Sequence, residues 1–153
     1  MALQDSGSRT VFESGAVREM GAGKGRTDLL PWATIGRILK DPFMNHLEVL
    51  SRDPEKIVVA QNALYHWACL RYGGDFEAML LEVAKQYEDG AAKYSPRNWE
   101  KGLPLLSFVD SLGRHYLKWR AHQTDEPHDR AVTWNLLGLI WTVEQQEKEM
   151  AKE

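Results

Sequence analysis

Prolines divide most of this chain into segments with helical spacing, and this punctuation constrains the fold more than any other feature. Five of the six prolines begin a segment whose apolar residues recur at three- and four-residue intervals. Proline is tolerated at this position because the first N–H groups of a helix have no partner within it. No segment shows the two-residue period of a strand, so we expect an all-α protein, with at most a hairpin in its first 30 residues. The predicted helices cover residues 31–40, 42–52, 54–71, 76–94, 104–122 and 127–150.

Length, charge and cysteine content exclude several classes of protein. The 153 residues suit one domain, and 19 basic against 22 acidic side chains lack the positive excess typical of nucleic-acid-binding proteins. The single Cys69 excludes an internal disulfide framework and a cysteine-rich zinc site. The sequence has no apolar run long enough to span a membrane and no apolar core near its start. We therefore expect no membrane span, no secretory signal and a cytoplasmic protein.

The first 30 residues differ in composition from the rest. Residues 1–28 contain five of the twelve glycines and lack helical periodicity. We therefore expect residues 1–30 to form an extended, loop-rich arm that precedes a single helical domain at residues 31–153. Residues 21–26 are rich in glycine and basic, but they do not match the Walker phosphate loop, in which Ser or Thr follows Gly-Lys.

Charge is unevenly distributed along the chain. Residues 85–120 carry seven basic and four acidic side chains, whereas residues 121–153 carry three basic and seven acidic ones. This pattern fits a phosphate-binding group beside a cation-binding group, and it fits two solvated helix faces equally well. On charge counts alone the solvated faces are favoured.

Several polar side chains lie where the helical wheel predicts a core or its edge. Glu88 lies at the edge of the apolar stripe of the 76–94 helix, where a carboxylate can be a metal ligand or a paired structural charge. The 104–122 helix carries a continuous polar stripe, which is a site or an exposed amphipathic face. Its members are Asp110, Ser111, Arg114, His115 and Lys118.

The last predicted helix carries polar and small residues within a mostly apolar sequence. His128 and Asn135 lie on one line with Ala131, Gly138 and Thr142. A buried asparagine requires hydrogen-bond partners, so we interpret His128 and Asn135 as part of a polar site, while close helix packing explains the small residues.

Acidic residues gather before this helix, and a loop with mixed chemistry precedes the 104–122 helix. Asp125, Glu126 and Asp129 can cap the last helix, and Glu126 and Asp129 also have the spacing to share a hard cation such as Mg²⁺. The loop at residues 93–102 offers cations for phosphates and Trp99 for stacking on a base. A solvated loop with an inward tryptophan explains it equally well.

The order of these sequence blocks resembles the phage-type dATP/dGTP diphosphohydrolases, the MazZ-like group of the MazG-like NTP pyrophosphatases. The resemblance covers roughly residues 11–31 and 82–142. The blocks are Ser14-Gly15-Ala16-Val17-Arg18, Gly23 to Pro31, Glu88 to Tyr94, Arg97 to Gly102, Asp110 with Arg114-His115, Asp125-Glu126, His128, and Trp134 to Leu137.

The resemblance implies an all-α pyrophosphatase that converts a deoxypurine nucleoside triphosphate to the monophosphate and pyrophosphate. It also implies a helical bundle, dimers or larger oligomers, and frequent carriage by phages or prophages. Residues 36–75 look like a helical insertion that would cover the site or form an oligomer contact. The wider superfamily shows Glu-x-x-Glu on one helix and Glu-x-x-Asp on a later one. Residues 126–129 fit the second motif, and nothing near Glu88 fits the first.

With this resemblance we assign roles to individual residues. Mg²⁺ or Mn²⁺ would be bound by Glu88, Asp110, Asp125, Glu126 and Asp129, and the catalytic residues would be Glu88, Asp110 and His128. The alternative is a catalytically silent helical module that senses nucleotides or contacts a protein partner. The substrate-binding residues would be Lys24, Arg26, Lys93, Arg97, Asn98, Trp99, Lys101, Arg114, His115 and Asn135.

Overall fold

A computed structural model describes residues 7–19 and 21–153, and it confirms the all-α class. The six helices are α1 (Trp32–Leu39), α2 (Phe43–Arg52), α3 (Ile57–Tyr72), α4 (Phe76–Lys93), α5 (Leu105–Arg120) and α6 (His128–Ala151). Two 3₁₀ turns, η1 (Thr27–Leu29) and η2 (Asn98–Lys101), precede α1 and α5. Helix α3 begins three residues later than predicted because residues 54–55 form a turn.

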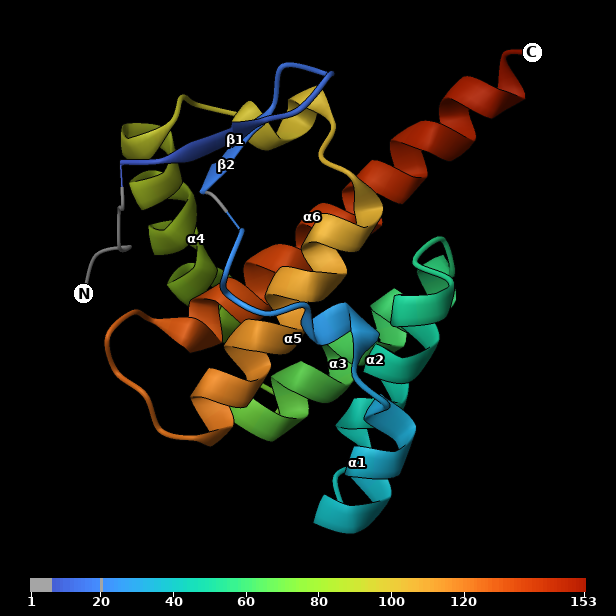
Figure 1. The fold of residues 1–153 in the computed structure, drawn as a ribbon, viewed down its shortest axis with the longest axis vertical. Helices are drawn as coiled ribbons and strands as arrows, with labels where there is room; N and C mark the ends of the chain where they lie inside the picture. The colour runs from blue at the N-terminus through green and yellow to red at the C-terminus, as the bar shows by residue number, and fades with distance from the viewer. Residues whose placement is uncertain (1–6, 20) are drawn as a thin grey trace.

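Helix α6 organises the bundle. It packs against α3, α4 and α5, and its buried residues extend from His128 to Val143. Figure 1 shows α5 and α6 in the middle of the molecule, with α1 and α2 on one side and α4 on the other, while α3 crosses beneath α5. Beyond Val143 the helix is mostly exposed and projects from the body of the protein. The prediction of a helix buried on most faces is therefore confirmed for its first four turns.

The predicted arm contains a short antiparallel hairpin. Strand β1 (Arg9–Val11) pairs with β2 (Val17–Glu19), with Arg9 opposite Glu19. Residues 1–6 and 20 of the predicted arm lie outside the described residues, and the boundary between arm and helical domain stays a prediction. No helix in the described ranges is long and apolar enough to cross a membrane.

Helix α4 is rotated relative to the predicted wheel. Its buried residues are Met79, Val83 and Gln86, whereas Leu80, placed in the predicted stripe, is exposed. A wheel built from apolar residues alone excludes Gln86, so it misplaced the centre of the buried face. The rotation matters for the site because Glu88 points to solvent and Gln86 does not.

Gly138 allows α5 and α6 to approach closely. A Cβ atom at this position would lie 2.5 Å from Cε1 of Phe108, whose side chain is fully buried. Gly90 on α4 is a suitable control for Gly138, because a Cβ atom added at Gly90 would have no neighbouring atom within 4 Å.

We predict that Gly138→Ala lowers the free energy of unfolding by about 1–3 kcal/mol, because the buried ring must shift to accept the methyl group. Gly90→Ala should instead raise it by up to about 1 kcal/mol, because alanine restricts the unfolded chain. Urea unfolding of both variants measures the two effects. Equal stability of the two variants would contradict the close packing of α5 on α6.

Candidate functional site

One large cavity lies between the arm, α4, the loop at residues 95–99, α5 and the start of α6. Its volume is about 1190 Å³. The lining is mixed, with aromatic side chains beside many charged ones. Among the described residues, none of the lining comes from residues 36–75, so the predicted insertion does not cover this cavity. Six basic side chains (Arg18, Lys24, Lys93, Arg97, Arg114 and Lys118) and three acidic ones (Glu19, Asp110 and Glu126) line it.

Arg18 and Asn135 form the polar centre of one wall. The Arg18 Nη2 donates to Asn135 Oδ1 at 2.6 Å, and its Nη1 donates to Ser107 Oγ at 3.1 Å. The guanidinium also lies 5.5 and 5.4 Å from the ring centroids of Phe108 and Trp134. Burial is the main cause that lowers the pKa of Arg18 to about 10. Arg18 stays charged at neutral pH, and it holds the hairpin against both central helices.

Both polar atoms of the buried Asn135 side chain make hydrogen bonds. Its Nδ2 donates to the Ala131 carbonyl at 2.8 Å and to Ser111 Oγ at 3.3 Å, while its Oδ1 accepts from Arg18. Asn135 is 2% exposed and lines the cavity. Sequence analysis identified Asn135 but not its partner, because an arginine in a three-residue strand gives no periodic signal.

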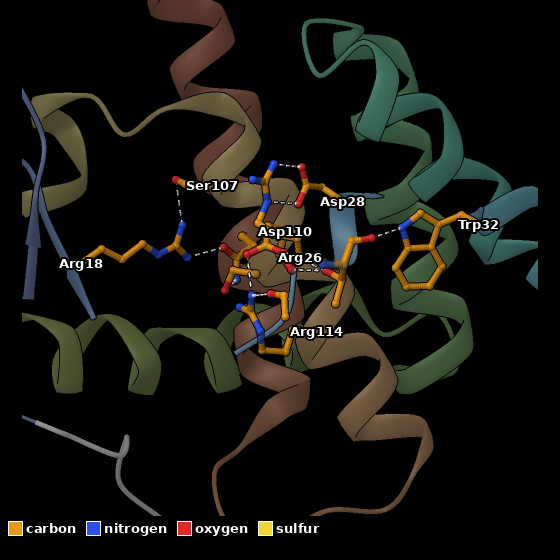
Figure 2. A network of polar contacts seen from close by, with 11 residues as sticks. Arg18, Arg26, Asp28, Trp32, Ser107, Asp110 and Arg114 are labelled. Carbon is orange, nitrogen blue, oxygen red and sulfur yellow. Dashed lines mark hydrogen bonds and ion pairs between the residues drawn. The ribbon is translucent and has the colours of Figure 1, made fainter. Parts of the chain in front are cut away.

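Asp110 connects α5 to the segment that precedes α1 (Figure 2). Its Oδ1 accepts from the Thr27 backbone N–H at 2.7 Å, and its Oδ2 accepts from Arg114 Nη2 at 2.5 Å. Arg114 Nη2 also donates to the Gly25 carbonyl at 2.8 Å. Both oxygens of Asp110 are therefore engaged by groups of the chain itself.

Arg26 lies outside the cavity, although we predicted it to bind substrate. Its guanidinium makes two hydrogen bonds to Asp28, at 2.7 and 2.6 Å, in the same network (Figure 2). Lys101, another predicted substrate-binding residue, is exposed and does not line the cavity either. The other eight predicted substrate-binding residues all line it.

The loop between α4 and α5 attaches the hairpin to the helices. Asn98 accepts from the Val17 N–H at 2.9 Å and donates to the Val17 carbonyl at 2.7 Å. Trp99 packs edge-on against Tyr87 and Trp141, with ring centroids 5.8 and 4.9 Å apart. Asn98 therefore serves to hold the cavity wall, and Trp99 is partly a packing residue as well as a lining one.

Two histidines from different helices meet at the cavity. His115 Nδ1 lies 2.9 Å from His128 Nδ1, and His128 Nε2 lies 2.7 Å from Asp125 Oδ1. His128 is 2% exposed, whereas His115 lines the cavity. Burial, followed by the positive charge of neighbouring groups, holds the pKa of His115 well below its usual value.

Three of the five predicted metal ligands do not line the cavity. Glu88 is exposed on the outer side of α4. Asp129 is paired with Arg71 of α3, whose Nη2 lies 2.9 Å from its Oδ2. Asp125 accepts from His128 instead. The rotation of α4 explains the position of Glu88, and the pairing with Arg71 turns Asp129 toward α3.

The donor groups present do not fit the predicted Mg²⁺ site. Of the predicted ligands only Asp110 and Glu126 line the cavity, and both oxygens of Asp110 already accept hydrogen bonds. Mg²⁺ requires several oxygen donors around one point. The tightest group of metal-binding side chains in the described residues is His115, Glu126 and His128, which is mainly imidazole. Imidazole suits transition metals better than Mg²⁺.

Gln86 lines the cavity, although the sequence did not single it out. It is 8% exposed and lines the cavity, and its Oε1 is buried without a hydrogen-bond partner. An unsatisfied buried amide costs free energy that a bound ligand can recover. Its position on the wheel, three residues after Val83 and seven after Met79, was the only available signal.

A cavity lined by twice as many basic as acidic side chains, set in a helical bundle, has the charge and size typical of a site for an anionic small molecule. Comparison with protein families identifies the group. The family described as "dATP/dGTP diphosphohydrolase, N-terminal" matches residues 60–152, and the chain belongs to this family. Comparison with curated proteins and with solved structures found no significant match.

We predict that the protein loses stability as the pH falls from 7 to 5.5, partly because of His115. The lowered pKa of His115 means that the unfolded chain binds the proton more readily, so acid favours unfolding. His115→Gln should reduce this loss by about 1 kcal/mol. Urea unfolding of both proteins at the two pH values measures the difference, and the same loss of stability in both would contradict the prediction.

Proposed function

We propose that this protein hydrolyses deoxypurine nucleoside triphosphates, dATP or dGTP, to the monophosphate and pyrophosphate. The observation that carries the proposal is the excess of basic side chains in a cavity large enough for a nucleotide. A triphosphate carries several negative charges, and a cavity with this excess attracts and holds it. Membership of a family described by dATP/dGTP diphosphohydrolase activity supports this choice of anion.

Two kinds of cation are available to the phosphates. Arg18 and Arg114 are fixed by hydrogen bonds to α5 and α6 or to the arm, so they present positive charge in a set position. Lys24 and Lys118 also line the cavity, and neither makes a hydrogen bond or ion pair with any side chain that the structure describes. These lysines are free to close on a bound phosphate, where charge-assisted hydrogen bonds are strong.

The cavity also offers a surface for the base. Tyr87, Trp99 and Trp134 line it, and the unsatisfied Gln86 Oε1 is an acceptor for an exocyclic amino group. Adenine and guanine both carry such a group. These side chains support a purine ligand without distinguishing the two bases.

A requirement for Mg²⁺ or Mn²⁺ stays a prediction, and of the five carboxylates that we assigned to the metal only Asp110 and Glu126 line the cavity. Addition of EDTA to the assay tests it. Loss of turnover would support a metal requirement, and full turnover in EDTA would contradict it.

A substrate panel tests the proposed reaction. We expect purified protein with Mg²⁺ to convert dATP or dGTP to the monophosphate, with release of pyrophosphate. Release of orthophosphate, or no turnover of any deoxynucleotide or ribonucleotide, would contradict the proposal. The positions of Glu88, Asp125 and Asp129 outside the cavity favour one alternative, a module that binds nucleotides without turnover, and binding without hydrolysis would support it.

We predict that Lys118→Ala raises KM about tenfold with little change in kcat, because it removes one charge-assisted contact to a phosphate. The matched control is Lys148→Ala, which removes an exposed lysine far along α6 and should leave both constants unchanged. Steady-state kinetics with the preferred substrate measures the change. An unchanged KM in both Lys118→Ala and Lys24→Ala would show that the phosphates lie elsewhere.

Assembly into a dimer or larger oligomer is also part of the proposal. Val58 and Tyr65 lie two turns apart on α3, and both are more than 60% exposed, as is Leu81 of α4. Contiguous apolar patches are typical of interaction surfaces, whereas single exposed apolar side chains are common on any protein, so the proposal rests on the family resemblance more than on these residues. Analytical ultracentrifugation measures the state directly, and a monomer at all concentrations would contradict it.

A further inference from the structure

Asp125, His128 and His115 form a continuous chain of hydrogen bonds that ends at the cavity. The chain begins at an exposed carboxylate before α6, passes through a fully buried imidazole at the start of α6 and reaches α5. The two contacts measure 2.7 Å, between Asp125 Oδ1 and His128 Nε2, and 2.9 Å, between the two Nδ1 atoms. Of the three residues only His115 lines the cavity.

With Asp125 ionised and both imidazoles neutral, this order of contacts allows one arrangement of the protons. An ionised carboxylate only accepts hydrogen bonds, so His128 Nε2 must carry a proton and donate it to Asp125. In neutral His128 the Nδ1 is then an acceptor, and His115 Nδ1 must be the donor. The Nε2 atom of neutral His115 is left with a free lone pair.

We propose that His115 is the general base of the hydrolysis, with Nε2 as the atom that accepts the proton, and that His128 and Asp125 are positioning residues that fix its tautomer. This role rests on the proposed function. The arrangement resembles a nucleophile-activating triad. In such a triad a carboxylate orients an imidazole by a hydrogen bond to the ring nitrogen that does not face the nucleophile. Here a second imidazole extends the chain, so that the carboxylate acts from outside the cavity.

The step balances without any further reagent. A water molecule gives one proton to His115 Nε2 while its oxygen forms a bond to a phosphorus atom next to the α–β bridging oxygen. The bond between that phosphorus and the bridging oxygen breaks, and the bridging oxygen keeps the electron pair. The products are the monophosphate and pyrophosphate, and the proton on His115 returns to solvent.

The surroundings of His115 keep it neutral, as a base must be. Burial disfavours a positive charge on this imidazole, and the positive charges of Arg18 of β2 and of Arg114 and Lys118 of α5 oppose it further. Glu126 is a carboxylate close to this imidazole. One of its carboxylate oxygens lies within 4.8 Å of a ring nitrogen of His115 and of a ring nitrogen of His128. Glu126 is therefore positioned to stabilise the imidazolium that forms when the proton is taken up.

The same residues suggest a competing interpretation, a metal ion bound by His115, Glu126 and His128. The hydrogen bonds argue against it. His128 uses one ring nitrogen for Asp125 and the other for His115, so it has no lone pair left for a metal unless one of these contacts breaks. Two further carboxylates, Asp110 and Asp129, already accept hydrogen bonds from Arg114 and Arg71.

The tautomers give a test that does not depend on activity. Nitrogen NMR of the folded protein without nucleotide should show His115 protonated at Nδ1 alone and His128 at Nε2. Asp125→Asn supplies an amide that can donate to His128, which lets the chain reverse and moves the His115 proton to Nε2. A wild-type His115 protonated at Nε2, or a bound metal that is lost on His115→Gln, would overturn the proposal.

Kinetics then tests the catalytic role. His115→Gln and Asp125→Asn should lower kcat about 100-fold or more and change KM little, because a general base contributes at this scale. The matched control is His66→Gln, which breaks the other described histidine pair, between His46 Nε2 and His66 Nδ1 at 3.1 Å, away from the cavity. It should leave kcat unchanged.

The two proposals fail in different ways. A wild-type protein that hydrolyses no nucleotide removes the proposed function, and the role of His115 with it. A wild-type protein that hydrolyses dATP or dGTP, with His115→Gln retaining its kcat, overturns only the role of His115.

Discussion

The Asp110 carboxylate is the contact on which the rest of the site depends. It accepts from the Thr27 backbone and from Arg114, so it fixes the end of the arm to α5. Gly113 makes the approach possible, because a Cβ there would lie 2.6 Å from Thr27 Oγ1 and 2.7 Å from Trp32 Cζ2. With the arm held at this end and at Asn98, the hairpin forms a wall of the cavity. Replacement of this carboxylate would leave the partly buried Thr27 N–H without its acceptor and would remove the ion pair with Arg114, which would keep only the Gly25 carbonyl.

Helix positions followed from the sequence because local signals determine them. Prolines and apolar periodicity located all six helices, and the nearly all-round apolar sequence of α6 identified the central one. The orientation of α4 did not follow, since its buried face includes Gln86, which a hydrophobic wheel excludes. The start of α3 was also wrong, because Asp53-Pro54-Glu55 forms a turn before the helix rather than its first turn.

The sequence indicated which residues lie together better than it indicated the partner of each residue. Eight of the ten predicted substrate-binding residues line one cavity, which the order of polar blocks already indicated. Roles depend on pairings between distant segments, and a single sequence does not contain these. Arg26 is engaged by Asp28 and Asp129 by Arg71, while Arg18 enters the cavity from a strand too short to give a pattern.

The arm lies wholly outside the region that matches the family, yet it supplies Arg18 and Lys24 to the cavity. The helices at residues 60–152 carry the histidine chain, Asn135 and Arg114, so the apparatus proposed for water activation belongs to the shared part of the chain. The charge and shape of the opposite wall belong to a separate segment, which is attached to the helices by hydrogen bonds of Asp110, Arg114, Asn98 and Arg18. A change in this N-terminal segment would therefore alter the charge of one wall of the cavity without altering the residues of the histidine chain.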